Sequence, residues 1–365
     1  MAGKRYLAPW RRAAAATREV APGADGREVL AALEGKPALY HCVSRIVWKE
    51  FVLGEAEKAE FVRLMRKWEA FSRVRVLTFC VMSNHFHLLV EVPERPEQEP
   101  TDGELLEHLG LIYRGQRLAG IRWELEHFRS QGNHPAAEAL RQRFLRRMWD
   151  LSVFMKALKQ DFTVRWNKRH AKRGNLWEER FKSVLVEDGH AARVVAAYID
   201  LNPVRAGIAR APEDYRWSGY GEAAAGKPRA REGIRQVMLE RGLANAEPRV
   251  ALHDTADWKR LMAGYRGLMA GDRARTDERD GGQGRRGKAR LSEADLMRRQ
   301  VRYFADGMVL GSKRFVDGVF DLTRGWFGAK RADGARKLAR AATPVWAMRA
   351  LRVMPYGAGA PGRGE

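Results

Sequence analysis

Two histidines one residue apart are the residues in this sequence best suited to chemistry. They occupy positions 85 and 87 in MSNHFHLLVEV, Met82 to Val92. In a β-strand successive side chains point to opposite faces, so His85 and His87 share one face while Phe86 and Leu88 share the other. Two imidazoles on one face could bind a divalent metal ion. A pair of surface or hydrogen-bonded histidines would give the same pattern. Motifs elsewhere in the chain are needed to distinguish a metal site from such a pair.

A tyrosine and an asparagine form the second candidate pair. In AAYIDLNPVRAG, Ala196 to Gly207, Tyr198 and Asn202 are four residues apart, which places them on one face of a helix. Pro203 disfavours the helical conformation at Asn202, so we expect the helix to end or kink there. Taken alone, the pair is also typical of core packing followed by a helix cap.

A basic stretch with interspersed aromatic rings, from about residue 165 to 182, is the third candidate. Cations that contact phosphates and rings that stack on bases are typical of single-stranded nucleic acid binding. The aromatic residues are Trp166, Trp177 and Phe181; a solvated charged loop is the alternative. The predicted DNA-binding cations here are Arg165, Lys168, Arg169, Lys172, Arg173, Arg180 and Lys182.

The elements that must position these residues follow from the hydrophobic pattern. Residues 38–47 and 74–82 are apolar and strand-like, and 85–92 forms a third strand after a Ser-Asn turn. Residues 55–71 have helical spacing. We therefore predict an α+β fold, with an antiparallel sheet, helices on one face, and the two histidines near the middle of the sheet.

The domain organisation follows from shifts in composition. We predict a basic lead-in, a central domain with a long helical insert, a flexible basic linker, a cationic helical C-terminal module, and a disordered tail. Their ranges are 1–33, 34–220 with the insert at about 94–149, 221–290, 291–352 and 353–365. The C-terminal module is expected to add DNA affinity, and a solubility or protein-contact role is the alternative.

Overall charge favours a polyanionic partner. The chain has 67 Lys and Arg against 45 Asp and Glu, a net charge of +22 and a pI near 10.4. The two cysteines, Cys42 and Cys80, lie in apolar strands and predict neither a disulfide scaffold nor a Cys-rich zinc site. No apolar run is long enough to span a membrane. We expect a cytoplasmic, nucleoid-associated protein with no membrane partner.

The order of these motifs resembles the HUH single-strand nucleases, and more closely the IS200-like Y1 transposases in their REP-associated tyrosine transposase branch. The resemblance covers roughly Ala38 to Tyr220 without the insert. It implies a ferredoxin-like sheet, Tyr198 as nucleophile, and His85, His87 and Asn202 as ligands of Mg²⁺ or Mn²⁺. It further implies single-stranded or hairpin DNA as substrate, contacts from Arg45 and Arg205, and a role in DNA transposition; a homodimer is left open.

The sequence departs from the family pattern in two motifs. Residues 44–47 read SRIV where the family has SRGN, and residues 174–181 read GNLWEERF where it has GHLFQGRF. Neither change removes a proposed chemical group. Both bear on which DNA sequence is recognised.

The implied chemistry is coherent. A phosphodiester resists nucleophiles because its oxygens are negative, and a divalent cation would neutralise that charge. Attack by Tyr198 would leave a 5′-phosphotyrosine and a free 3′-OH. A free phenol has a pKa of about 10, so activation is needed, and the sequence identifies no general base.

A non-catalytic nucleic-acid-binding protein with the same fold is the main alternative. A zinc hydrolase is less favoured, because the chain has neither an HExxH helix nor a Cys cluster.

Overall fold

The computed structural model describes residues 33–239, 255–270, 307–324, 333–338 and 345–349, with residues 8, 28, 31, 327 and 331. The predicted tail and most of the predicted lead-in lie outside these residues, as does the cationic stretch 272–290 of the predicted linker. No helix in the described ranges is long and apolar enough to cross a membrane.

A seven-stranded sheet forms the centre of the molecule, in the order β2-β3-β1-β4-β5-β7-β6. Its first part comprises β1 (Ala38–Arg45), β2 (Arg75–Val81), β3 (His85–Val92) and β4 (Lys182–Val186), all paired antiparallel. Helix α2 (Glu55–Ser72) joins β1 to β2, and α6 (Leu151–Arg169) precedes β4. The order β4-β1-β3-β2 with these helices is ferredoxin-like. The predicted α+β class is confirmed. Strand β3, with its histidines, lies between β1 and the edge strand β2, and not near the middle of the sheet as predicted, because β5, β7 and β6 extend the sheet on the other side.

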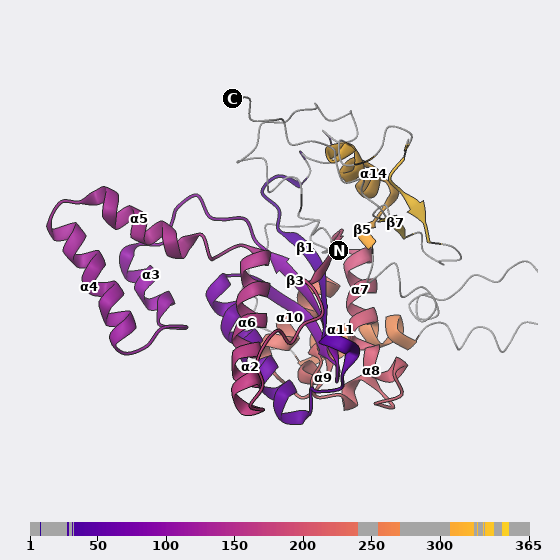
Figure 1. Ribbon diagram of the computed structural model, residues 1–365. Coiled ribbons are helices and arrows are strands. Elements are labelled where there is room, and N and C mark those ends of the chain that lie inside the picture. Colours follow the sequence, from indigo (N-terminus) through magenta and orange to yellow (C-terminus); the bar gives the residue numbers. More distant parts are fainter. Residues whose placement is uncertain are drawn as a thin grey trace, which may run out of the picture.

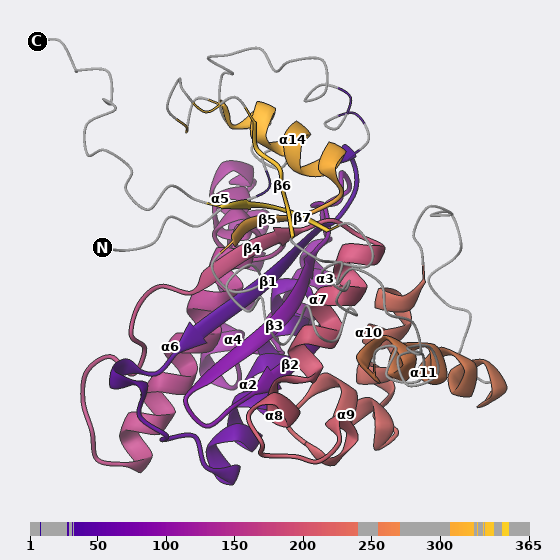
Figure 2. The same cartoon turned by 90° about the vertical axis from the view of Figure 1, so that its right-hand side faces the viewer.

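Helices cover both faces of the sheet, whereas the sequence predicted one covered face (Figure 2). Alternate β3 side chains explain the difference: Phe86 and Leu88 join the core under α2 and α6, and Leu89 joins a second core. The second core is covered by α7 (His190–Asp200), α9 (Gly219–Ala224) and α10 (Pro228–Met238). Short helices η2 (Val47–Lys49), α8 (Asn202–Arg205) and η3 (Pro212–Asp214) connect these elements.

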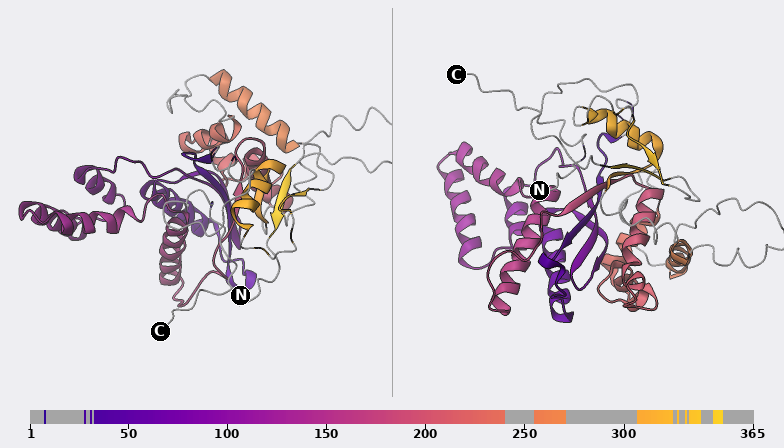
Figure 3. Two further views of the ribbon diagram at one scale, coloured as in Figure 1. Left: turned by 90° about the horizontal axis from the view of Figure 1, so that it is seen from above. Right: turned by 45° about the vertical axis from the view of Figure 1, so that its right-hand side comes forward.

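Three helices fill the predicted insert and project from the sheet as an arm (Figures 1 and 3). They are α3 (Asp102–Leu109), α4 (Gln116–Ser130) and α5 (His134–Leu145). Thr101 caps α3 in a capping box with Glu104, and the Asn133 side chain accepts from Ala136 N at the start of α5. These caps explain why a charged stretch breaks into separate helices.

The region predicted as a linker contains ordered helices that belong to the second core. Helix α9 crosses the predicted boundary at residue 220, α10 follows it, and α11 spans Thr255–Ala270. Tyr265 of α11 is fully buried and donates a hydrogen bond from its hydroxyl to Asp200 Oδ2 at 2.7 Å. The prediction of a flexible linker was wrong for these helices. Composition reports only local sequence, whereas α11 contacts Asp200, which is far away in sequence.

The described part of the C-terminal module adds strands as well as the predicted helix. Helix α14 (Lys313–Leu322) begins at Ser312, whose side chain accepts from Phe315 N. Strand β5 (Gly307–Gly311) runs parallel to β4, and β7 (Trp346–Arg349) and β6 (Arg336–Lys337) extend the sheet. The description of this module as helical was therefore incomplete: its strands continue the central sheet.

Candidate active site

The two histidines of β3 face helix α7. In the register of β1 with β3, His87 lies opposite Val43 and His85 lies opposite Arg45. Phe86 between them is buried in the opposite core. The strand alternation read from the sequence therefore holds, and both imidazoles point to the face that α7 covers.

Tyr198 lies on α7 directly against these rings. Its side chain is 1% exposed, and its ring centroid is 5.8 Å from that of His87. The His85 and His87 centroids are 5.1 Å apart. Helix α7 presents an almost wholly apolar face to the sheet, so the packing of Ala, Val and Ile around Tyr198 sets the position of its ring.

Asn202 both caps the end of α7 and lines the same cavity. Helix α7 ends at Asp200, and the Asn202 amide nitrogen donates to the carbonyl oxygens of Tyr198 and Ile199, each at 3.1 Å. These bonds use the nitrogen, which leaves the amide oxygen as the atom available to a ligand. The capping interpretation and the ligand interpretation are thus compatible.

The carboxyl group of Asp200 anchors this end of α7 to the sheet. It is completely buried and accepts hydrogen bonds from the Thr78 hydroxyl of β2 and from Tyr220 N, besides Tyr265. Burial raises the pKa of Asp200 to about 7, although the three hydrogen bonds oppose that rise. The anchor explains how Tyr198 and Asn202 hold their places relative to β3.

Both histidines are kept neutral by their surroundings. Burial, with a smaller contribution from Arg45 and Arg205, lowers the pKa of His85 to about 4. Burial also lowers the pKa of His87 well below its usual value, and the neighbouring His85 and His41 add to the shift. A neutral imidazole keeps a lone pair, which is the form that binds a metal ion.

Hydrogen bonds also select which ring nitrogen carries that lone pair. His85 Nδ1 lies 2.7 Å from the Asn84 side-chain oxygen and donates to it, so its lone pair is on Nε2. His87 Nδ1 lies 2.9 Å from His41 Nε2. When His87 donates in that bond, its own Nε2 is the free ligand atom. Two imidazole Nε2 atoms and an amide oxygen are a donor set that suits Mn²⁺ or Mg²⁺.

His41 is the functional candidate that the sequence analysis missed. It is a fully buried residue of β1 whose ring is 5.1 Å from that of His87 and 5.8 Å from that of Tyr198. The sequence did carry a signal for His41: Leu39 and Val43, two residues before and after it, are apolar, so an imidazole stands between two apolar residues on one face of the strand.

Among the described residues no group of three or more His, Cys, Asp and Glu side chains is arranged to hold a metal ion. The candidate set needs the Asn202 amide, which is not of those types.

The cavity around these groups is basic, with a volume of about 690 Å³. Arg45 and Arg205 line it, and none of the described lining residues carries a carboxylate. The Arg205 guanidinium carbon lies 4.6 Å from the centroid of the Tyr198 ring. Its Nη1 atom is buried and has no hydrogen-bond partner within the described part of the chain. A buried cationic donor without a protein partner can donate a charge-assisted hydrogen bond to an anion such as a phosphate.

The other predicted DNA-binding cations divide into two groups. Lys182 begins β4 opposite Val43, a residue that lines the cavity. The remainder lie on α6 and the loop after it, where Arg165 pairs with Asp161 and Arg169 with Glu57. Those without an ion pair among the described residues are Lys168, Lys172, Arg173 and Arg180, all exposed.

Two of the three rings predicted to stack on bases are core residues. Trp177 is 3% exposed and Phe181 is 4% exposed, and both pack under α2 and α6. The Trp177 ring contacts Phe61, Phe86 and Phe162. The third ring, Trp166, stacks on His170 with centroids 4.5 Å apart. The base-stacking role is therefore wrong for Trp177 and Phe181.

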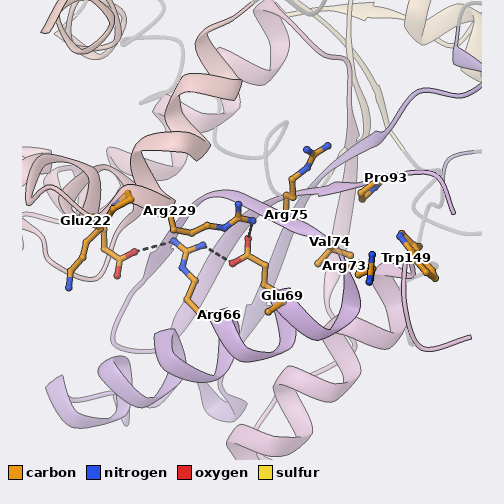
Figure 4. A pocket seen from close by; sticks show the side chains of 12 residues that line it. Arg66, Glu69, Arg73, Val74, Arg75, Pro93, Trp149, Glu222 and Arg229 are labelled. Atoms are coloured by element: carbon orange, nitrogen blue, oxygen red, sulfur yellow. Dashed lines mark hydrogen bonds and ion pairs between the residues drawn. The ribbon is translucent and has the colours of Figure 1, made fainter. Parts of the chain in front are cut away.

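A second basic cavity, of about 710 Å³, lies at the β2 edge of the sheet (Figure 4). Its centre is Glu69 of α2, which is 2% exposed. Glu69 accepts from Arg66 at 2.9 Å, from Arg229 of α10 at 2.6 Å and from Val76 N at 2.6 Å. Arg66 also reaches Glu222 of α9 at 3.1 Å. Its described lining residues include neither histidine nor tyrosine. Its ion pairs join α2, α9 and α10, and the hydrogen bond from Val76 N joins them to β2.

Comparison with known proteins adds little at the level of sequence. No family model matches the chain, and no curated protein matches it. One solved structure with some similarity is that of a REP-associated tyrosine transposase bound to a REP hairpin. The match covers 58% of this chain and 85% of that chain, with 14% sequence identity and a TM-score of 0.33. At this level of similarity, function has to be inferred from the side chains around the cavity.

Proposed function

We propose that this chain cuts and rejoins single-stranded or hairpin DNA through a covalent 5′-phosphotyrosine at Tyr198, in the manner of REP-associated tyrosine transposases. The observation that carries the proposal is the Arg205 guanidinium next to the Tyr198 ring, with its buried Nη1 atom lacking a hydrogen-bond partner among the described residues, in a cavity that also holds two neutral imidazoles. A phosphodiester supplies the anion that this arrangement needs. It also supplies an electrophile for the phenol.

Each cavity group has a part in the reaction. Arg205 and Arg45 bind the oxygens of the scissile phosphate, and Arg205 orients the Tyr198 ring. His85, His87 and Asn202 would hold Mg²⁺ or Mn²⁺. When bound, the ion neutralises charge on the phosphate and orients it.

The bond changes balance without an external energy source. The Tyr198 oxygen forms a bond to phosphorus and loses its proton, while the bond from phosphorus to the 3′ oxygen breaks and that oxygen gains a proton. The products are a 5′-phosphotyrosine and a free 3′-OH. Attack by a 3′-OH on the phosphotyrosine reverses these changes, so joining needs no nucleotide cofactor.

A labelled random-sequence pool of single-stranded DNA, about 60 nucleotides long, tests the proposal. In the presence of Mn²⁺ we expect a covalent band on a denaturing gel with a 3′-end label and none with a 5′-end label, because the protein stays on the 3′ fragment. A chelator should abolish the band. Sequencing of the trapped strands would then identify the target.

Tyr198→Phe should remove the band and leave DNA binding within about twofold, since it removes one oxygen and no cation. Tyr215→Phe is the matched control. The Tyr215 hydroxyl is also buried and donates to Val81 O at 2.7 Å, so its loss should lower the free energy of unfolding by about 1 kcal/mol. Adduct formation should be unchanged. A wild-type chain that binds DNA and forms no adduct would support the non-catalytic alternative.

A further inference from the structure

Two aromatic side chains next to the cavity are almost completely exposed. Trp48 is 83% exposed and Phe51 is 81% exposed, on the connection between β1 and α2. Single exposed rings are ordinary, but two large rings three residues apart on one short segment are typical of a binding surface. The segment directly follows Arg45, which lines the cavity.

The backbone of this segment is strained. Trp48 has a φ of 56° and Lys49 a φ of 59°, and neither is glycine. Left-handed conformations at such residues cost about 1 kcal/mol or more each, and they persist where the surrounding structure imposes them. The Trp48 ring lies in solvent and contributes nothing to the core, so core packing does not explain the strain.

Hydrogen bonds fix the segment to the metal-ligand candidates. Ile46 N donates to Asn84 O at 2.8 Å, and the Asn84 side-chain nitrogen donates to Lys49 O at 3.0 Å. The oxygen of the same Asn84 amide accepts from His85 Nδ1. One side chain thus connects the aromatic segment with the His85 ring, so the position of the segment is set relative to the cavity.

We propose that Trp48 and Phe51 stack on unpaired bases of the strand whose phosphate lies in the cavity, and so select single-stranded over duplex DNA. The inference rests on the proposed function for the presence of that strand. Charge favours nucleic acid over a protein partner: Arg45 precedes the rings, Lys49 lies between them, and the whole chain carries +22. Bases in a duplex are already stacked and would not reach the rings.

Fluorescence anisotropy with a 20-nucleotide oligo(dT) strand and a duplex of equal length tests this, with the full chain carrying Tyr198→Phe to prevent cutting. Trp48→Ala should weaken single-strand binding about 5-fold or more, the low end of 1–3 kcal/mol per stacked base. Phe51→Ala should act in the same direction. The salt dependence should not change because no cation is lost. Trp48→Phe should retain most of the affinity.

Trp123→Ala is the matched control. Trp123 is 64% exposed on α4 of the arm, with its ring stacked on His127 at 5.0 Å. This variant should bind like the parent, and thermal melting should show that all variants fold. Equal affinity of Trp48→Ala, Phe51→Ala and the parent for oligo(dT) would overturn the inference, as would an equal loss of duplex binding.

The two proposals fail separately. A Trp48-dependent preference for single strands in a chain that forms no phosphotyrosine would retain the stacking surface and refute the chemistry. If an adduct forms, and if neither its formation nor the preference for single strands changes in Trp48→Ala and Phe51→Ala, the proposed chemistry stands and the stacking surface is refuted.

Discussion

The two cavities at opposite ends of β3 differ in whether carboxylates line them: Glu69 and Glu222 line one, and no described carboxylate lines the other. They have similar volumes, about 690 Å³ at the His85 end and about 710 Å³ at the Pro93 end. A strand of this length separates them by roughly 23 Å. In the edge cavity, Glu69 brings Arg66 and Arg229 together. In the histidine cavity, Arg45 and Arg205 meet no carboxylate among the described lining residues.

In the edge cavity Arg66 and Arg229 form ion pairs within the protein, whereas the described lining of the histidine cavity offers no carboxylate to Arg205. The carboxylate of Glu69 is already satisfied by two guanidiniums and a backbone N–H, so its cavity offers stability. The Arg205 Nη1 atom is buried without a described partner, which is costly unless a ligand provides one. Substitutions in the two cavities should therefore affect different measurements.

After the nucleophile Tyr198 itself, the largest effect on chemistry should come from the histidines of β3. His87→Ala and His85→Ala each remove one imidazole from the metal-ligand candidates, and a bound ion contributes several kcal/mol to phosphoryl transfer. We expect adduct formation to slow by about 1,000-fold or more. Timed sampling on denaturing gels gives the rate, and calorimetric titration with Mn²⁺ gives metal affinity. Wild-type rates in either variant would exclude a role for these imidazoles.

Arg205→Ala should slow adduct formation by roughly 100-fold, the usual cost of removing one group that stabilises developing charge. It should also flatten the dependence of log affinity on log salt by about 0.7, one phosphate contact on a single strand. Arg205→Lys should restore the salt dependence and only part of the rate, because an ammonium lacks the planar fork. An unchanged rate and salt slope in Arg205→Ala would place the phosphate elsewhere.

The sequence predicted the parts of the site that depend on local periodicity. Strand alternation placed His85 and His87 on one face, and the four-residue spacing placed Tyr198 and Asn202 on one side of a helix end. It did not identify His41, because a single histidine in an apolar strand is indistinguishable from a core residue until its partner strand is known. His41 meets His87 only through the pairing of β1 with β3.

Long-range packing also explains the other errors. Trp177 lies in a loop rich in cations, which suggested nucleic acid, yet its neighbours in space are Phe61 and Phe86. Helix α11 lies in a region rich in Gly, Arg and Ala, yet it packs into the second core through Met262, Tyr265 and Met269, and Tyr265 donates a hydrogen bond to Asp200. Neither contact has a local signature, so composition could predict neither.

The edge cavity should respond through stability alone. Glu69→Gln keeps the size of the side chain and removes the charge shared by Arg66 and Arg229. We expect a loss of about 2 kcal/mol, since hydrogen bonds to a charged group contribute more than neutral ones. Urea unfolding measures it. Below the unfolding transition the rate of adduct formation should equal that of wild type, and a large fall in that rate would show that the two cavities are coupled.

The smallest expected effect belongs to His41, which touches the chemistry only through His87. His41→Phe keeps a ring of similar size but cannot accept the hydrogen bond from His87 Nδ1, so the lone pair of His87 is no longer confined to Nε2. We expect the Mn²⁺ concentration for half-maximal adduct formation to rise about tenfold, while the rate at saturating Mn²⁺ recovers most of its wild-type value. His41→Gln retains a hydrogen-bonding group, so its Mn²⁺ requirement should lie between those of wild type and His41→Phe.

Cys42→Ala is the control: Cys42 is the next residue of β1 but belongs to the opposite core, so this substitution should change stability and not the Mn²⁺ requirement. A fall in the saturated rate with an unchanged Mn²⁺ requirement would instead mean that His41 acts on Tyr198, whose ring lies 5.8 Å from it.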